Sequence, residues 1–426
     1  MISRKQRIKV IALIGLMSVG ICGCSLKNKG KPSEKDSIKN QKITYCTWED
    51  EKDYTEKIVN TFEAEHSNIH VNIKYIDSNI KETGLEKCLD SEKIDVIGVK
   101  NINDVLALKQ KGQVIDLTGK IEDSDIDISY YGNMYNDISD NGKYYCLPTR
   151  KTSWALVYNP DIFREQGIKE PGKMTWDEFA DLAEKMTKQS GDRKIWGTYF
   201  VDWVYNFMGI QEKEYLYDDD QTYLKKSLEL LNRIYYEDQS SMTPAEAKKE
   251  DWISSYEQGN IAMMPMGEWF VGQILADEKS GKTDVNWELA PIPTPEKQVD
   301  DTTWGTYQLA AITKACKNSG KTDAAFQFLE YLCGEEGAKI YASNGMIPAY
   351  INHDIETIYK SAVGSHNVDA FFETWQIQEN PVFEGYTELE DILEKETERY
   401  LERKQDLGTT MKNFEAKRTK YLEKTR

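Results

Sequence analysis

Apolar and polar residues follow two different spacings after position 41, and the spacing indicates where strands and helices lie. Residues two apart share a face in a strand, whereas residues three and four apart share a face in a helix. The pattern predicts strands over residues 42–48, 68–77 and 94–99. It predicts helices between and after them, over residues 50–66, 81–93 and 101–112, of which the helix over 81–93 is the weaker. This βαβαβ order predicts an α/β fold with a parallel sheet flanked by helices on both faces.

The predicted sheet also indicates where a ligand would bind. Ligands of parallel sheets lie beyond the carboxyl ends of the strands. Here those ends carry Trp48 with Glu49, Asp77 with Ser78, and Lys100 with Asn101. About 385 residues follow the first 40. Because one core rarely supports that length, two lobes are expected.

The first 24 residues have the pattern of a secretory signal peptide. Four basic residues precede an uncharged apolar run from Val10 to Ile21, which is shorter than the roughly 20 apolar residues that a membrane-spanning helix needs. The next letters, "ICGC", resemble the lipobox of bacterial lipoproteins, with Cys24 as the residue that carries the lipid. Residues 25–40 are polar and predict a flexible tether. The alternative is an ordinary signal peptide with two accidental cysteines.

Charge narrows the functions that this chain can have. The formal net charge is −18, and it becomes −22 without the first 24 residues, which hold four basic and no acidic residues and so leave 50 basic against 72 acidic ones. The negative electrostatic potential of so acidic a chain disfavours nucleic acid and anionic lipid as partners. No later segment is long and apolar enough to predict a transmembrane helix, so the body is expected to be soluble.

The cysteines do not indicate a disulfide framework. Two of the seven lie in the signal, and the others are Cys46, Cys88, Cys146, Cys316 and Cys333. Their odd number and the lack of CxxC spacing predict mostly reduced, part-buried thiols, with a single pair left open.

Four segments of the chain resemble one protein family. They are "GKYYCLPTRKTSWALVYNPDIF" (142–163), "GNIAMMPMGEWF" (259–270), "LAPIPTPE" (289–296) and "AAFQFLEYLCGEEGAKIYASNGMIPAY" (324–350). In this order and spacing the chain resembles the extracellular solute-binding proteins of bacterial ABC importers, in the branch that includes maltose-binding protein and other sugar-binding lipoproteins. Two departures are Cys146, where a small residue is common, and the high charge of the last hundred residues.

The resemblance implies a two-lobe periplasmic-binding-protein fold of type II, in which each lobe is a sheet flanked by helices and the solute lies in the cleft between them. Three hinge crossings are expected near Pro148 to Ser153, Ile292 to Pro295 and Gly345 to Ala349. Lobe 1 would hold residues 41–149 and 296–345, and lobe 2 would hold residues 150–295 and 346–426. Each crossing contains a proline, which fixes φ and leaves few torsions to absorb a rotation.

Glu268 and Trp269 are the leading candidates for ligand contact. A pyranose has an apolar C–H face, on which an indole packs, and a rim of hydroxyls, which a carboxylate binds through charge-assisted hydrogen bonds. The family motif also implies a stacking Trp at this position, and Gly267 would allow the backbone to approach the ligand. The alternative is that Trp269 covers the core of lobe 2. Further candidates at strand ends and crossings are Trp48, Glu49, Arg150, Thr152, Asp202, Trp203, Trp304 and Tyr386.

Catalysis is the main alternative to binding. A surface glycosidase needs two carboxyl groups facing a sugar, and Glu49, Asp202 and Glu268 could supply a pair by accident. However, the sequence holds no GxSxG, HExxH or GxxxxGK[ST] motif. Four histidines in all argue against a metal site. We therefore expect no enzyme activity, cofactor or metal.

The carboxy-terminal run, residues 388–424, shows helical spacing interrupted at Gly408. It is expected to form helices that pack on lobe 2, and the alternative is a coiled-coil arm for a partner.

The sequence thus predicts a monomeric, lipid-anchored protein outside the cytoplasm that binds a sugar or oligosaccharide and delivers it to the permease of an ABC importer. The alternatives are a non-sugar solute, such as a polyamine, a peptide or glycerol phosphate, a surface glycosidase, and an adhesin.

Overall fold

The computed structural model describes residues 40–77, 85, 88–89, 93–190, 193–296 and 302–425. The predicted signal peptide, nearly all of the predicted tether and Cys24 lie outside these residues. Within them, no helix is long and apolar enough to cross a membrane.

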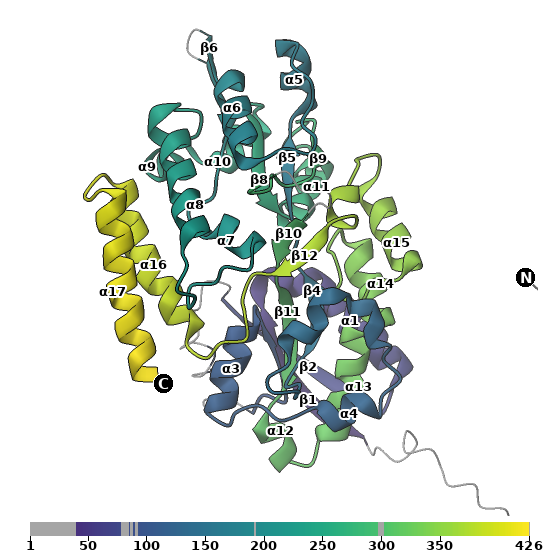
Figure 1. The fold of residues 1–426 in the computed structure, drawn as a ribbon. Helices are drawn as coiled ribbons and strands as arrows, with labels where there is room; N and C mark the ends of the chain where they lie inside the picture. Colours follow the sequence, from purple (N-terminus) through teal and green to yellow (C-terminus); the bar gives the residue numbers. More distant parts are fainter. Residues whose placement is uncertain are drawn as a thin grey trace, which may run out of the picture. The chain divides into compact units, whose positions relative to one another are not determined.

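The first sheet has five strands in the order β2-β1-β3-β11-β4 (Figure 1). Their bounds are β1 Gln41–Trp48, β2 Ile69–Ile76, β3 Val96–Val99, β4 Leu147–Lys151 and β11 Tyr307–Ile312. β1 pairs in parallel with both β2 and β3, which confirms the predicted parallel core. β11 arrives from far along the chain and runs antiparallel to β3 and β4, so the complete sheet is mixed.

Helices cover this sheet, and their apolar faces form its core. They are α1 (Lys52–Glu65), α3 (Ile102–Gln110), α4 (Thr118–Glu122), α12 (Lys314–Asn318), α13 (Thr322–Cys333) and α14 (Glu335–Ser343), with the 3-10 turns η2 (Glu49–Glu51), η3 (Ile128–Tyr131) and η4 (Asn133–Ile138). α15 (His353–Val363) packs on α14 and is linked to Asp369 through Lys360. The predicted helical face of α1 is confirmed, because Tyr54, Ile58, Val59 and Phe62 are all buried.

The second sheet also has five strands, in the order β6-β7-β8-β5-β9. Their bounds are β5 Trp154–Tyr158, β6 Lys188–Ser190, β7 Arg193–Thr198, β8 Ile261–Gly267 and β9 Glu288–Ala290. β8 is central, with β7 parallel to it and β5 antiparallel. All of its residues are buried, since it has strands on both sides and helices over its faces, which explains its continuous apolar run.

A second set of helices surrounds this sheet. They are α5 (Pro160–Gln166), α6 (Trp176–Met186), α7 (Phe207–Gln211), α8 (Thr222–Asn232), α9 (Pro244–Glu250), α10 (Trp252–Glu257) and α11 (Trp269–Ser280), with a π-helical turn η5 (Arg233–Glu237) and a 3-10 turn η6 (Asp369–Phe371). α6 begins with a capping box, in which Thr175 and Glu178 each hydrogen-bond the other's backbone N–H. This confirms Thr175 as the N-cap.

Two strands of a third, small sheet lie where the chain passes between the larger sheets. β10 (Thr302–Gly305) pairs in parallel with β12 (Trp375–Gln378). The chain leaves the first sheet at Lys151 and enters the second at Trp154, and it returns between Ala290 and Tyr307. Residues 347–349 run beside β4, where the Lys151 N–H donates to Ile347 O and the Ala349 N–H donates to Thr149 O. The two lobes are thus the two large sheets with their helices, and their exact boundaries remain a proposal.

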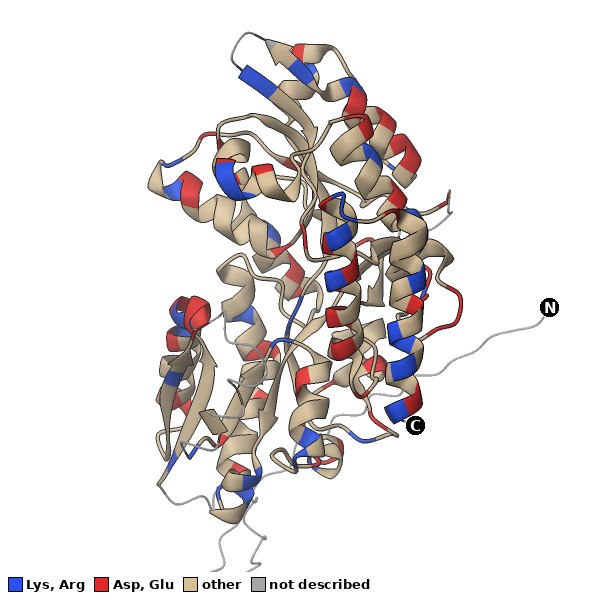
Figure 2. Cartoon of the chain, turned by 90° about the vertical axis from the view of Figure 1, so that its left-hand side faces the viewer, with Lys and Arg blue, Asp and Glu red and all other residues tan. Residues whose placement is uncertain are grey.

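The chain ends in two antiparallel helices, α16 (Tyr386–Leu401) and α17 (Leu407–Thr425). α17 packs on α8, and Arg418 of α17 donates to Tyr217 O at 3.1 Å. Figure 2 shows basic and acidic positions interspersed along the ribbons of this pair. The carboxy-terminal run therefore packs on the second lobe, as predicted, and most of its charged residues are exposed, whereas Glu396 and Arg418 are buried.

The five cysteines beyond the signal are buried. The sulfur atoms of Cys46 and Cys88 lie 3.5 Å apart. Burial raises the pKa of the Cys146 thiol to about 12, so this cysteine stays protonated at neutral pH.

Candidate functional site

An aromatic cluster fills the second lobe beside the crossing. Trp304 of β10 stacks on Trp154 of β5 with ring centroids 5.2 Å apart, and Trp269 meets Trp154 edge to face at 5.2 Å. Trp304 and Trp154 are fully buried, whereas Trp269 is half-buried. Trp304, predicted as a ligand contact, therefore packs in the interior in this structure.

Gly267 has a different role from the one expected. A Cβ built on this residue would lie 1.9 Å from Cζ3 of Trp269. The glycine therefore makes room for the indole ring of Trp269, and no ligand is needed to explain it.

Glu268 lies directly before α11, and its carboxyl group is buried. Its side chain is 1% exposed, and neither carboxylate oxygen has a hydrogen-bond partner. Burial raises the pKa of Glu268 to about 7, although the nearby Arg150 guanidinium, and then the backbone N–H groups of Ser153, Glu268 and Trp269, favour the charged form. A buried carboxyl without a partner is unfavourable, so Glu268 is a group that a conformational change or a ligand could satisfy.

Arg150 and Thr152 lie on the first crossing and bind other crossing segments. Arg150 is buried, its Nη1 contacts Met346 Sδ at 2.9 Å, and its guanidinium lies 5.3 Å from the Tyr54 ring centre. The Thr152 hydroxyl accepts from the Thr306 N–H at 2.8 Å and donates to Thr306 O at 3.3 Å. In this structure both residues join the crossing strands.

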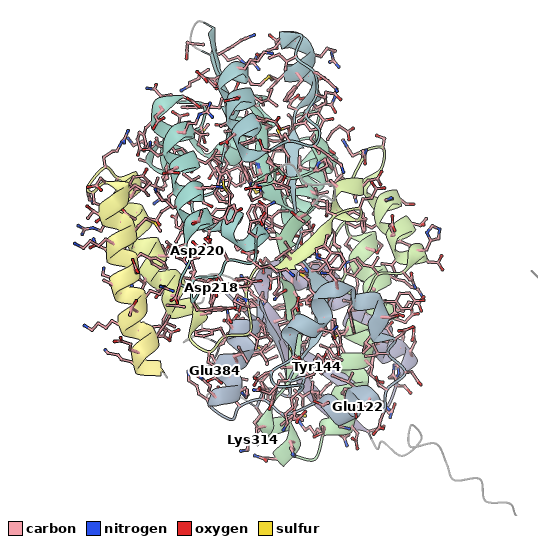
Figure 3. The ribbon with its side chains drawn as sticks, in the orientation of Figure 1. Glu122, Tyr144, Asp218, Asp220, Lys314 and Glu384 are labelled. Atoms are coloured by element: carbon pink, nitrogen blue, oxygen red, sulfur yellow. The ribbon has the colours of Figure 1, made fainter. Side chains whose placement is uncertain are left out.

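The first cavity opens between α7 and α16 and measures about 290 Å³. Two predicted residues line it: Trp203, which is 51% exposed, and Tyr386, whose hydroxyl accepts from the Leu216 N–H. Asp202 precedes the cavity, and its carbonyl accepts from the hydroxyl of Tyr205 in the cavity wall. The structure thus brings Trp203 and Tyr386 together from segments far apart in the sequence. Figure 3 labels Asp218 and Asp220 on the nearby segment that leads into α8.

Four carboxyl groups also line this cavity, and no Lys or Arg does. They are Glu379, Glu390, Asp391 and Glu394. Burial raises the pKa of Glu379 to about 7. Burial and then the neighbouring Glu379 carboxylate raise the pKa of Glu390 to about 8. At neutral pH these two groups therefore carry protons for part of the time and can both donate and accept hydrogen bonds.

The sequence reasoning did not name these carboxyl groups. Glu379 follows β12, a strand that the sequence pattern did not predict. Glu390, Asp391 and Glu394 lie on α16, in the carboxy-terminal run that was predicted to pack on lobe 2 and not to bind a ligand. The available signal was their spacing, since residues 390, 391 and 394 share one face of a helix with Tyr386.

The two remaining candidates, Trp48 and Glu49, lie at the carboxyl end of β1 and differ in exposure. Trp48, at the carboxyl end of β1, is 3% exposed and lies under Lys100, whose Nζ is 4.5 Å from the ring centre. Glu49 starts η2 and is exposed. Neither residue lines the first cavity.

Two sheet-and-helix lobes, joined where the chain crosses between the two large sheets, define the two-lobe fold of periplasmic binding proteins. The family model for bacterial extracellular solute-binding proteins matches residues 48–339, more than half of the chain. The chain therefore belongs to this extracellular family, whose members bind solutes.

Similar proteins agree with this assignment. The multiple sugar-binding protein of Streptococcus mutans is 30% identical over 42% of this chain and 41% of its own length, so the match spans less than half of that relative. The arabinooligosaccharide-binding protein of Bacillus subtilis is 26% identical over 79% of this chain and 78% of its own length. The crystal structure of a sugar transporter from Rhizobium etli, in an open conformation, has a TM-score of 0.79 and 25% identity over 89% of this chain and 99% of its own.

Proposed function

We propose that this protein binds a sugar or oligosaccharide between its lobes and delivers it to the membrane permease of an ABC importer. The observation that carries the proposal is the first cavity, which opens between α7 and α16 of the second lobe. There the ring of Trp203, 51% exposed, adjoins four carboxyl groups, and Tyr386, 2% exposed, forms part of the buried wall. Aromatic faces bind the C–H face of a sugar ring, and carboxyl groups bind its hydroxyls. Names of relatives support the same ligand class, since they refer to multiple sugars and to arabinooligosaccharides.

The proposal includes the location of the protein. The lipobox-like "ICGC" favours lipid attachment at Cys24, with the signal peptide removed and the folded part held outside the membrane as a monomer. Trp269 and Glu268 remain proposed ligand contacts in a closed state, since Trp269 is half-buried and Glu268 has no hydrogen-bond partner here.

A polyamine is the alternative with a specific observation in its favour, because the cavity lining is acidic and lacks basic residues. The same lining disfavours glycerol phosphate, which is an anion. A surface glycosidase would release shorter saccharides on incubation, and product analysis distinguishes it from a binding protein.

Calorimetric titration and thermal shift with mono-, di- and oligosaccharides, polyamines and peptides test the proposal. We expect saccharides to bind and to raise the melting temperature. Trp203→Ala should weaken saccharide affinity about tenfold, because it removes a stacking face. The matched control is Trp375→Ala, since Trp375 is 56% exposed and does not line this cavity. Equal affinity of both variants would contradict the site, and binding of polyamines alone would contradict the ligand class.

A further inference from the structure

Two cysteine side chains of the first lobe are in direct contact. The Sγ atoms of Cys46 and Cys88 lie 3.5 Å apart, although the two residues are 42 positions apart in the chain. Cys46 belongs to β1, which has β2 on one side and β3 on the other, and its side chain is fully buried. Cys88 is 8% exposed and has helical backbone. The fold thus brings a thiol of a central strand against a thiol from the connection between β2 and β3.

Packing holds both sulfur atoms in the interior. Leu85, three residues before Cys88, is 1% exposed and also has helical backbone. Residues three apart share one face of a helix, so Leu85 and Cys88 belong to the same buried face. A disulfide bond is about 2.0 Å long, which leaves about 1.5 Å for side-chain rotation to close between Cys46 and Cys88.

The other three cysteines beyond the signal lie in different surroundings. The Cys333 thiol donates to Leu147 O at 3.7 Å. Burial raises the pKa of the Cys146 and Cys316 thiols to about 12, and it raises the pKa of Cys333 well above its usual value. Because the thiolate is the reactive form of cysteine, these three side chains stay inert at neutral pH. Among the cysteines that the structure describes, Cys46 and Cys88 are therefore the pair placed for oxidation.

The location of the family supplies the conditions for a bond. The chain belongs to an extracellular family, and disulfides form and persist in oxidising compartments outside the cytoplasm. We propose that Cys46 and Cys88 are a site of reversible oxidation, at which a disulfide bond forms once the protein has left the cytoplasm. This inference does not depend on which ligand the protein binds.

The bond would constrain the first lobe. It would close a loop that contains α1 and β2 and would join the central strand β1 to the connection that precedes β3. A cross-link of this kind removes conformations from the unfolded chain, so the oxidised protein should be more stable than the reduced one. Since both cysteines lie in the first lobe, the effect should be confined to that lobe.

The reaction needs a disulfide compound as oxidant. In the folded protein Cys88 is the more exposed of the two residues, so its thiol loses a proton first and its sulfur attacks the oxidant's S–S bond. A mixed disulfide forms and one oxidant thiolate leaves. The Cys46 thiol then loses its proton, its sulfur attacks Sγ of Cys88, and the second oxidant thiolate leaves. Two electrons pass to the oxidant, and the two protons convert its thiolates into thiols.

Peptide mapping tests the inference directly. The purified full chain is reduced, unfolded in urea and refolded in buffers of oxidised and reduced glutathione, and remaining thiols are then alkylated in acid. Digestion without reductant and mass spectrometry should find the Cys46 peptide joined to the Cys88 peptide, two hydrogen atoms lighter than the separate pair. Reduction with a phosphine should separate them. The oxidised protein should melt about 4 °C above the reduced one.

Cys88→Ala should lose both the linked peptide and the rise in melting temperature. Cys316→Ala is the matched control, because Cys316 is a buried cysteine of α12, and it should keep both. If Cys88→Ala does not fold, the peptide map of the unmodified protein still decides. Recovery of Cys46 and Cys88 as alkylated thiols from the oxidising buffer, or linkage of either to another cysteine, would overturn the inference. Saccharide titrations test the proposed function separately, and neither result determines the other.

Discussion

The first cavity and the aromatic cluster at the crossing contain the same kinds of residue but differ in access. In the cavity, Trp203 is 51% exposed beside carboxyl groups, whereas at the crossing Trp304 is fully buried against Trp154. The cavity can thus exchange water for a ligand, and the cluster cannot do so in this conformation. The comparison shows that an indole after an apolar run belongs either to a binding site or to a core, and that exposure decides between them.

Replacing an indole should lower the free energy of unfolding by different amounts in the two regions, and the largest loss is expected in the cluster. Trp304→Ala leaves a cavity against Trp154 and should lower the free energy of unfolding by about 3–5 kcal/mol. Trp203→Ala should lower it by about 1 kcal/mol or less, because that ring is already half in water. Urea denaturation of both variants measures the difference. Equal losses would mean that the two regions do not differ in packing.

The buried carboxyl group of Glu268 should make stability fall as pH rises. Its pKa of about 7 lies above the value of about 4.3 for an unperturbed Glu. Between these values the folded chain retains a proton that the unfolded chain has released, so stability decreases from about pH 4.3 to pH 7 and remains lower above that. The stability advantage of Glu268→Gln over the unmodified protein should grow by about 2–3 kcal/mol between pH 5 and pH 8.

Chemical denaturation at both pH values measures this effect. Glu49→Gln is the control, since Glu49 is exposed on η2, and it should change stability little at either pH. A gain for Glu268→Gln that is the same at pH 5 and pH 8 would exclude titration of Glu268 as its cause.

The smallest loss of stability is expected when the Thr152 hydroxyl at the crossing is removed. Thr152→Val removes two hydrogen bonds to Thr306 without changing the side-chain shape, and it should cost about 1 kcal/mol. Thr61→Val is the control, because the Thr61 hydroxyl is exposed and bonds only within α1. Differential scanning calorimetry compares the two variants, and equal melting temperatures would show that the Thr152 bonds do not stabilise the crossing.

Local pattern predicted much of the fold, because the spacing of apolar residues in α1 and β2 reflects which face each element buries. The site was harder to predict. Trp203 and Trp304 both follow apolar runs, and only the packing of β10 against Trp154 makes Trp304 inaccessible. Glu390 belongs to a charged helix that appears solvated in sequence, and its burial depends on contact with segments that are distant in the chain. Exposure of a single side chain is a tertiary property that local spacing does not encode.

The pairing of β10 with β12 constrains how the lobes can turn. Their register joins Thr302 to Trp375 and Gly305 to Gln378, so the crossing strand β10 shares one hydrogen-bonded ladder with the segment before α16. Twisting one strand without the other would break that ladder. Any rotation that preserves the ladder must therefore move these two strands as one body.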